Sequence, residues 1–105
     1  AVSALGQSYG DKGFGPLTNL PPTSVAARSG AAYLYTRSIS TWTTRAYIKA
    51  SNTEAGDAFG QSLALSGAGS TLVVGGVAEA SASTGIGGDQ SINSAPNAGA
   101  VYVFQ

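Results

Sequence analysis

The chain has no cysteine, no histidine and no methionine among its 105 residues. The lack of cysteine excludes disulfide bonds and thiolate metal sites. The lack of both histidine and cysteine removes the most common general base and the thiol nucleophile of enzymes. We therefore predict a protein that is not an enzyme and has no catalytic residues. The absent initiator methionine is what we expect of a processed or trimmed chain.

Charged side chains are also scarce. Only 10% of the residues are Asp, Glu, Lys or Arg, against about 25% in average soluble domains, and the net charge is zero. A chain with no basic surface cannot neutralise phosphate groups, which argues against nucleic acid as a partner. No apolar run approaches the roughly 20 residues that span a bilayer, so we expect no membrane insertion. A net charge near zero favours association between molecules.

Helical periodicity is nearly absent, whereas strand patterns are frequent. Residues 59–65 alternate, with Phe59, Leu63 and Leu65 on one face and small residues on the other. A Gly- and Ser-rich turn follows, and residues 71–74 are apolar on both faces. These features predict a strand that packs closely on its small side, followed by a central strand.

Two further strand patterns flank this pair. Residues 100–104 are apolar on both faces and follow a connection of 22 residues, 77–98, which is long for a compact domain. Residues 45–50 alternate cleanly, which predicts an edge strand with one wet face. In that strand we expect Ala46, Ile48 and Ala50 to point inward and Arg45, Tyr47 and Lys49 to point outward.

One strand motif occurs twice, 69 positions apart. GAAYLY at residues 30–35 corresponds to GAVYVF at residues 99–104. A weaker sequence similarity relates GDKGFG at residues 10–15 to GDAFG at residues 56–60. We therefore interpret residues 1–29 as an irregular or degenerate partial blade and residues 30–105 as a blade unit, within a single domain overall.

GDAFGQSLALSGAGSTLVVGG followed by GAVYVF, with TWTTRAYIKASN before it, resembles the FG-GAP repeat. That repeat is the blade unit of integrin-α-type β-propellers and of many bacterial exported proteins. The resemblance implies an all-β fold with antiparallel sheets of β-propeller blade type, about one and a half blades in this chain. We expect neighbouring chains to complete it, or the chain to be a fragment of a longer propeller. The resemblance also implies a secreted or cell-surface location.

Many FG-GAP members bind calcium through spaced acidic residues in the loop between the first two strands of the blade. The matching loop here, residues 66–70, has no carboxylate, although calcium requires several oxygen ligands. We therefore expect no metal and no cofactor. Glu54 and Asp57 precede the Phe59 strand, and we interpret Asp57 as a residue that tightens the turn into that strand through its side-chain oxygen.

The remaining polar and aromatic residues suggest an interaction surface. Aromatic residues at strand spacing are typical of a core, which we expect for Tyr33, Tyr35 and Tyr102, whereas Tyr47 fits a surface equally well. Asp89 and Asn93 offer oxygens for a loosely held cation, but we prefer a polar loop that is hydrogen-bonded to itself. The candidate interaction surface comprises Trp42, Arg45, Tyr47, Lys49, Asp89 and Asn93.

The sequence favours a non-enzymatic extracellular or cell-surface module for interaction or adhesion. Its partner would be another protein or further copies of itself, bound through open sheet edges, with a glycan as a further possible ligand. The alternative is a structural subunit of a self-assembling extracellular fibre, sheath or pilus-like filament. Low charge, small residues and an incomplete blade motivate this alternative.

Overall fold

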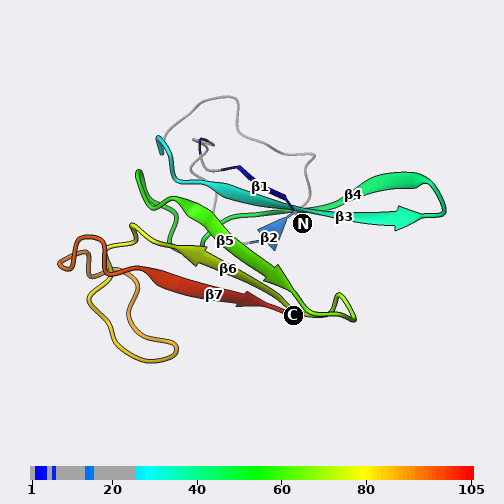
Figure 1. Ribbon diagram of the computed structural model, residues 1–105. Coiled ribbons are helices and arrows are strands. Elements are labelled where there is room, and N and C mark those ends of the chain that lie inside the picture. The colour runs from blue at the N-terminus through cyan, green and yellow to red at the C-terminus, as the bar shows by residue number, and fades with distance from the viewer. Residues whose placement is uncertain (1, 5, 7–13, 16–25) are drawn as a thin grey trace.

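The computed structural model describes residues 2–4, 6, 14–15 and 26–105. This part of the chain contains strands, turns and bends and no helix, and the strands form two antiparallel sheets (Figure 1). No helix that could cross a membrane is found among the described residues. The all-β prediction and the prediction of antiparallel blade-type sheets are confirmed.

The first sheet contains four strands in the order β1-β3-β4-β2. Its bounds are β1 (Val2–Ala4), β2 (Phe14–Gly15), β3 (Ala31–Ser38) and β4 (Thr41–Ile48). Two of these strands, β1 and β2, come from the segment before residue 30, so both segments of the predicted division contribute to one sheet. The division itself stays a prediction, because most of that segment lies outside the described residues. Most of the GDKGFG motif, residues 10–15, also lies outside the described residues; its last two residues form β2.

The second sheet contains three strands in the order β5-β6-β7. Its bounds are β5 (Phe59–Leu65), β6 (Leu72–Gly76) and β7 (Ala100–Phe104). The prediction that residues 71–74 form a central strand is confirmed. No described strand pairs with the outer edge of β7.

A turn and a bulge set the register of this second sheet. The Ser66 hydroxyl accepts hydrogen bonds from the backbone N–H groups of Ser70 and Thr71 and closes the turn between β5 and β6. The pairing is irregular between Phe59 and Ser62, where β5 carries two extra residues. Because an even number of residues is inserted, the side-chain alternation keeps its phase on both sides of the bulge. Phe59, Leu63 and Leu65 therefore share one face, as the sequence predicts.

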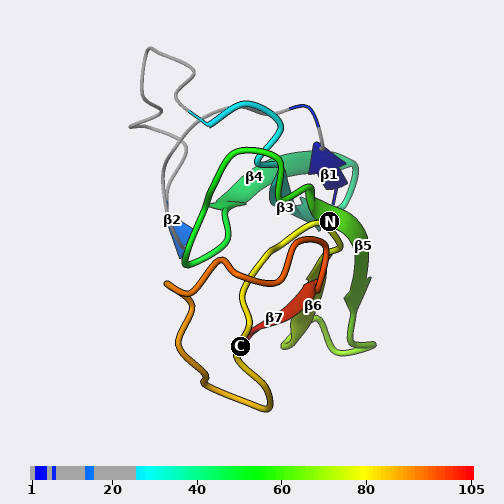
Figure 2. The same cartoon turned by 90° about the vertical axis from the view of Figure 1, so that its left-hand side faces the viewer.

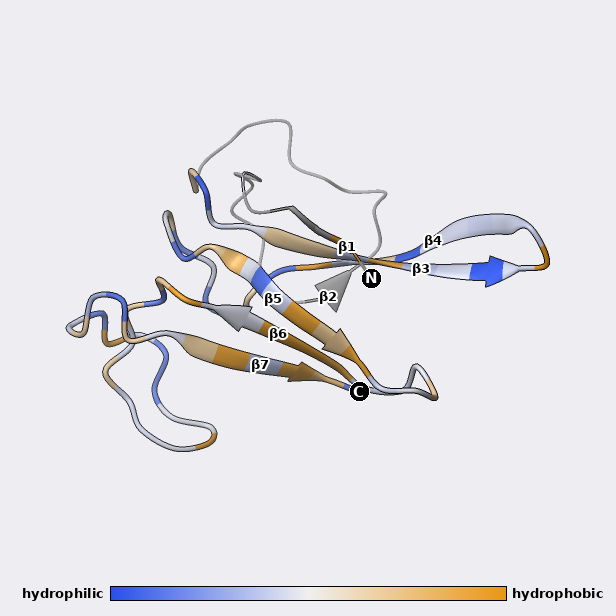
Figure 3. Ribbon diagram, in the orientation of Figure 1, coloured by the Kyte–Doolittle hydropathy of each residue, from blue (hydrophilic) through white to orange (hydrophobic). Residues whose placement is uncertain are grey.

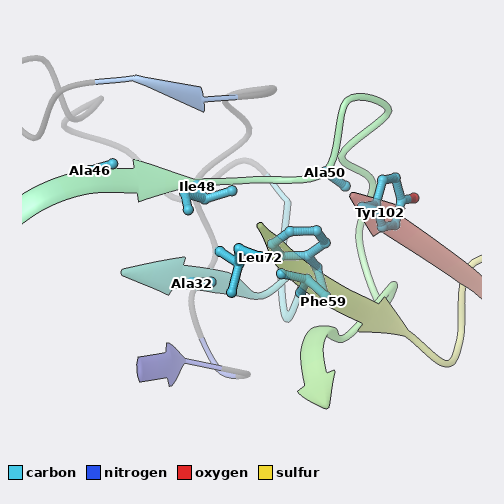
Figure 4. Packing of buried hydrophobic residues seen from close by; sticks show 8 residues of the cluster. Ala32, Ala46, Ile48, Ala50, Phe59, Leu72 and Tyr102 are labelled. Carbon is cyan, nitrogen blue, oxygen red and sulfur yellow. The ribbon is translucent and has the colours of Figure 1, made fainter. Parts of the chain in front are cut away.

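The two sheets pack face to face around Phe59 (Figure 4). Small alanines on the first sheet allow the larger side chains of the second to approach closely. The Phe59 ring makes edge-to-face contacts with Tyr102, at a centroid distance of 5.2 Å, and with Phe104, at a centroid distance of 6.3 Å. The buried cluster consists of Ala32, Ala46, Ile48, Ala50, Phe59, Leu72, Val74 and Tyr102.

The sheets also meet through their backbones. Gly30 forms a parallel bridge with Phe59, and the Phe59 N–H donates to the Ser29 carbonyl at 2.9 Å. Gly30 has a φ of +82°, and a Cβ at this position would lie 2.1 Å from the Phe59 carbonyl oxygen. Only glycine fits this approach, so Gly30 is required where the two sheets join.

The predicted orientation of residues 45–50 is correct for one face and wrong for two residues of the other. Ala46, Ile48 and Ala50 are buried in the core, as predicted. Arg45 is exposed, but Tyr47 is only 4% exposed and Lys49 is 0% exposed. Near its end β4 is not an edge strand, because β2 pairs with it there. The alternation distinguishes the two faces but does not show whether the second face is covered.

Candidate functional site

The charges of the described residues separate completely along the chain. All cations lie within residues 26–53 and all acids within residues 54–105. The cations are Arg28, Arg37, Arg45 and Lys49, and the acids are Glu54, Asp57, Glu79 and Asp89. The net charge is zero, but cations and acids occupy different segments of the described chain and therefore different parts of the fold.

The cationic part includes a projecting hairpin, residues 35–45, which we call the β3–β4 arm. Figure 1 shows the ends of β3 and β4 extending well beyond the second sheet. Arg37 lies over the Trp42 ring, 5.6 Å from its centroid, and Trp42 is 66% exposed. Ile39 at the tip is 95% exposed. The arm therefore presents cationic, aromatic and aliphatic groups to solvent.

Aromatic side chains continue from this arm along the outer face of the first sheet. The register pairs Tyr33 with Tyr47 and Arg37 with Trp42, and strand alternation places these residues on the same face. The rings of Tyr33 and Tyr47 lie 5.4 Å apart. Tyr33 and Tyr35 are half-buried, whereas Tyr102 is buried, so the core prediction holds fully for Tyr102 alone.

The acidic part includes a hollow beside the connection between β6 and β7, which we call the loop groove. Its larger section has a volume of about 810 Å³ and is lined by the outer face of the second sheet, including Val101 and Val103, and by residues 85–88. A smaller section of about 490 Å³ contains both Glu54 and Asp89. Asn52, Gly88 and Gln90 line both sections, so the two sections form one continuous groove. The groove is mainly apolar in its larger section and acidic in its smaller section.

A buried polar chain fixes the connection to the sheet. The Tyr102 hydroxyl donates to Asn52 Oδ1 at 2.6 Å, and Asn52 Nδ2 donates to Glu79 Oε1 at 2.9 Å. Glu79 Oε2 accepts the Ser81 backbone N–H at 3.0 Å. Burial raises the pKa of Tyr102 above its ordinary value, so the hydroxyl stays a donor. The sequence carries no motif that singles out Asn52 or Glu79.

Lys49 and Asp57 also have structural roles near this chain. The Lys49 ammonium donates to Ser29 Oγ at 2.6 Å and to the Gly30 carbonyl, beside the junction of the sheets. Asp57 Oδ2 accepts the Glu54 backbone N–H at 2.8 Å, which confirms that Asp57 tightens the turn before β5. Burial raises the pKa of Asp57, and the Glu54 hydrogen bond opposes that rise.

The connection is hydrogen-bonded to itself, as we preferred on sequence grounds. Asp89 Oδ1 accepts both the Ser91 N–H at 2.9 Å and the Ser91 hydroxyl at 2.6 Å, which lowers the pKa of Asp89. Ser81 and Ser83 donate to the Asp89 carbonyl, and Asn93 Nδ2 donates to Glu54 Oε2 at 2.5 Å. No three acidic side chains of the described residues gather as metal ligands would.

The structure divides the candidate interaction surface into separate parts. Trp42 and Arg45 are exposed on the β3–β4 arm, whereas Asp89 and Asn93 are exposed on the connection after β6. Tyr47 and Lys49 are buried and offer no free surface. The sequence analysis did not include Arg37 or Glu54 in the candidate interaction surface. Arg37 contacts Trp42, and Glu54 accepts a hydrogen bond from Asn93.

Comparison with protein families gives one match. The model of the FG-GAP repeat matches residues 42–104, which is more than half of the chain. The chain belongs to the FG-GAP repeat family. Searches of curated proteins and of solved structures found no match. In this FG-GAP chain the matched region begins on β4 and contains the whole second sheet, so the suspected family is confirmed.

The FG-GAP repeat identifies the chain as a β-propeller-type module. Propellers stack sheets face to face, and here the first sheet covers one face of the second. On the other face of the second sheet, Val101 is 70% exposed and Val103 is 60% exposed. Figure 3 shows apolar colour along β5, β6 and β7. One face of this FG-GAP sheet is therefore packed and the other is open.

Proposed function

We propose that this FG-GAP chain is a non-enzymatic interaction or adhesion module that works outside the cell or at its surface. The observation that carries the proposal is the open face of the second sheet. Val101 and Val103 expose apolar surface there, beside the half-buried Val73. Exposed apolar patches of this kind mark interaction sites.

The occupant we propose for this face is a further sheet of FG-GAP type. The open face carries small and β-branched residues, such as Ala64, Val73 and Gly75, and resembles the alanine-rich face of the first sheet that already packs on the second. Sheets of this kind pack about 10 Å apart when their facing side chains are small or interdigitate. The bulky face of the second sheet packs on the small face of the first sheet. The small, open face of the second sheet therefore fits the bulky face of a further sheet of the same type.

Structural roles for the buried acids support the proposal that the module is not an enzyme. Asp57 and Glu79 accept hydrogen bonds from the backbone N–H groups of Glu54 and Ser81. The 105-residue sequence also has no histidine and no cysteine. Hydrolysis of a polysaccharide panel that disappears in Asp57→Asn would contradict this part of the proposal.

The size of the purified chain in solution tests the open face. We expect light scattering to show small, closed assemblies that fall to monomers when Val101 and Val103 are both changed to threonine. Leu65→Thr, which changes an exposed apolar residue on the inner face of β5, is the control and should leave the assembly intact. A double variant that assembles like the original chain would reject the open face as the contact.

The location is tested separately on intact source cells. Trypsin added to intact cells should cleave the protein at exposed arginines, such as Arg37 and Arg45, if the protein lies outside the cell. Cleavage that requires lysis would overturn this part of the proposal.

The separation of charge favours a second candidate, a structural subunit of a self-assembling extracellular fibre, sheath or filament. The β3–β4 arm is cationic, and the loop groove is acidic. Large, open assemblies in light scattering would support this candidate and contradict small, closed ones.

A further inference from the structure

Among the described residues, the β3–β4 arm belongs to a segment of the chain, residues 26–53, that contains cations and no acid. Arg37 and Arg45 are exposed. Ile39 and Trp42 expose apolar surface beside these cations. The contact of Arg37 with the Trp42 ring holds the guanidinium against a flat apolar surface, which preorganises both groups for docking.

The loop groove has the complementary properties. Glu54 and Asp89 lie in its acidic section, and the hydrogen bonds from Ser91 keep Asp89 ionised. Ile86 of the adjoining section is also exposed. The groove therefore offers acidic and apolar surface side by side, matching the cations and the apolar side chains of the arm, and the docked arm leaves Val101 and Val103 to the further sheet.

The arm and the groove of one molecule lie at opposite ends. In Figure 1 the hairpin tip points to the right, while the segments that contain Glu54 and Asp89 lie at the left. Figure 2 views the molecule from the side of these segments, where the long connection before β7 loops outward. The two complementary surfaces of a single copy are thus too far apart to contact each other.

We propose that the β3–β4 arm of one copy docks in the loop groove of a second copy, with Arg37 and Arg45 facing Glu54 and Asp89. This inference rests on the proposed function, because it names the partner of the interaction module. A second copy is favoured over any other anionic partner because both halves of the contact are present on this chain. Glu54 and Asp89 are both exposed, so the docked cations can reach the two carboxylates.

This contact is heterologous, because the surface used on one copy differs from the surface used on the next. Each copy keeps a free arm and a free groove after docking. Repetition of the contact closes a ring if the rotation between copies allows it and otherwise builds an open filament.

Charge reversal provides the test. One variant carries Arg37→Glu and Arg45→Glu, and the other carries Glu54→Lys and Asp89→Lys. Each variant alone places like charges in the contact, so its dissociation constant should rise by roughly tenfold or more. A mixture of the two restores opposite charges at every arm and groove, so sedimentation velocity should show assembly again, with alternating copies.

The control is Ala68→Glu, which adds a charge to the exposed turn between β5 and β6 and should leave assembly unchanged. Circular dichroism checks that each variant folds, and Arg37→Gln with Arg45→Gln is the milder variant if charge reversal prevents folding.

Raising the salt from about 20 to about 500 mM should weaken the assembly of the original chain, because salt screens exposed charges.

Three results would overturn the inference. The first is a monomer at low salt and high concentration, which would also contradict self-assembly through the open face and leave only open-face binding to other proteins. The second is a mixture of the two charge-reversed variants that fails to assemble. The third is assembly that ignores charge reversal but is lost with Val101→Thr and Val103→Thr, which would support the open face and reject the arm.

Discussion

At the scale of single residues, the approach of Gly30 to Phe59 holds the two sheets together. Gly30 and Gly56 both have left-handed φ values, but only Gly30 is crowded by backbone atoms. Alanine in the left-handed region costs about 1–2 kcal/mol, so we expect Gly56→Ala to lose about that much free energy of unfolding. Gly30→Ala should lose clearly more, because the sheets must also separate. Urea unfolding measures both, and equal losses would contradict the role of the contact.

Asp57 and Asp89 should give stability opposite dependences on pH. Burial raises the pKa of Asp57, so the folded state binds its proton more tightly than the unfolded state does. The contribution of the carboxyl group to stability therefore falls as the pH rises above the ordinary Asp pKa of about 4. The melting temperature of the original chain relative to Asp57→Asn should decrease as the pH rises above that value.

For Asp89 the sign is reversed. Its hydrogen bonds with Ser91 lower the pKa, so its contribution is present above the unfolded pKa and is lost as the pH falls through the folded pKa. The melting temperature relative to Asp89→Asn should increase as the pH rises from about 2 to about 4. Thermal melts of the original chain and the two variants, at pH values below and above about 4, give the comparison. Parallel trends for both aspartates would refute the opposite pH dependences.

At the scale of the elements, the β3–β4 arm departs most from the sequence interpretation. The sequence predicts two separate strands here, one in the motif at residues 30–35 and one at residues 45–50. The structure instead has one continuous hairpin, with Ser38 paired to Thr41 across a two-residue turn. Hairpin turns of this length usually contain Gly or Asn, and the Ile39-Ser40 turn has neither, so the usual turn signal is missing.

The tip of the arm carries backbone strain that a substitution can relieve. Ile39 has a φ of 58°, which is strongly disfavoured for a β-branched residue. Since Ile39 is exposed, Ile39→Gly removes the strain without leaving a cavity, and we expect a gain of about 1 kcal/mol in arm stability. Ser40→Gly, at a residue without positive φ, should bring a loss instead. Hydrogen exchange of the β3 and β4 amides measures both, and matching effects would reject the explanation.

At the scale of the whole molecule, one cluster around Phe59 joins both sheets. Truncating a buried phenylalanine typically costs about 3–5 kcal/mol, and we expect this loss for Phe59→Ala. Because the cluster spans both sheets, amides of β4 and β6 should lose protection together. Leu65→Ala, at a partly exposed position on β5, should cost much less. Loss of protection in one sheet alone would show that the sheets fold independently.

The sequence by itself determined the strands of the second sheet, the central position of β6, the shared face of Phe59, Leu63 and Leu65, and the membership of the FG-GAP family. These follow from local alternation and from a motif that is continuous along the chain. The inward set of β4 followed for the same reason.

Only the tertiary structure decided which faces are covered and where the charges lie. Tyr47, Lys49 and Glu79 are buried because segments remote in sequence pair with them or form hydrogen bonds with them. The alternation of a strand cannot reveal such neighbours, because burial depends on the whole set of packed strands. From residue 26 onward the order of cations and acids is visible along the chain, but only the folded sheets place the cationic arm and the acidic groove at opposite ends of the molecule.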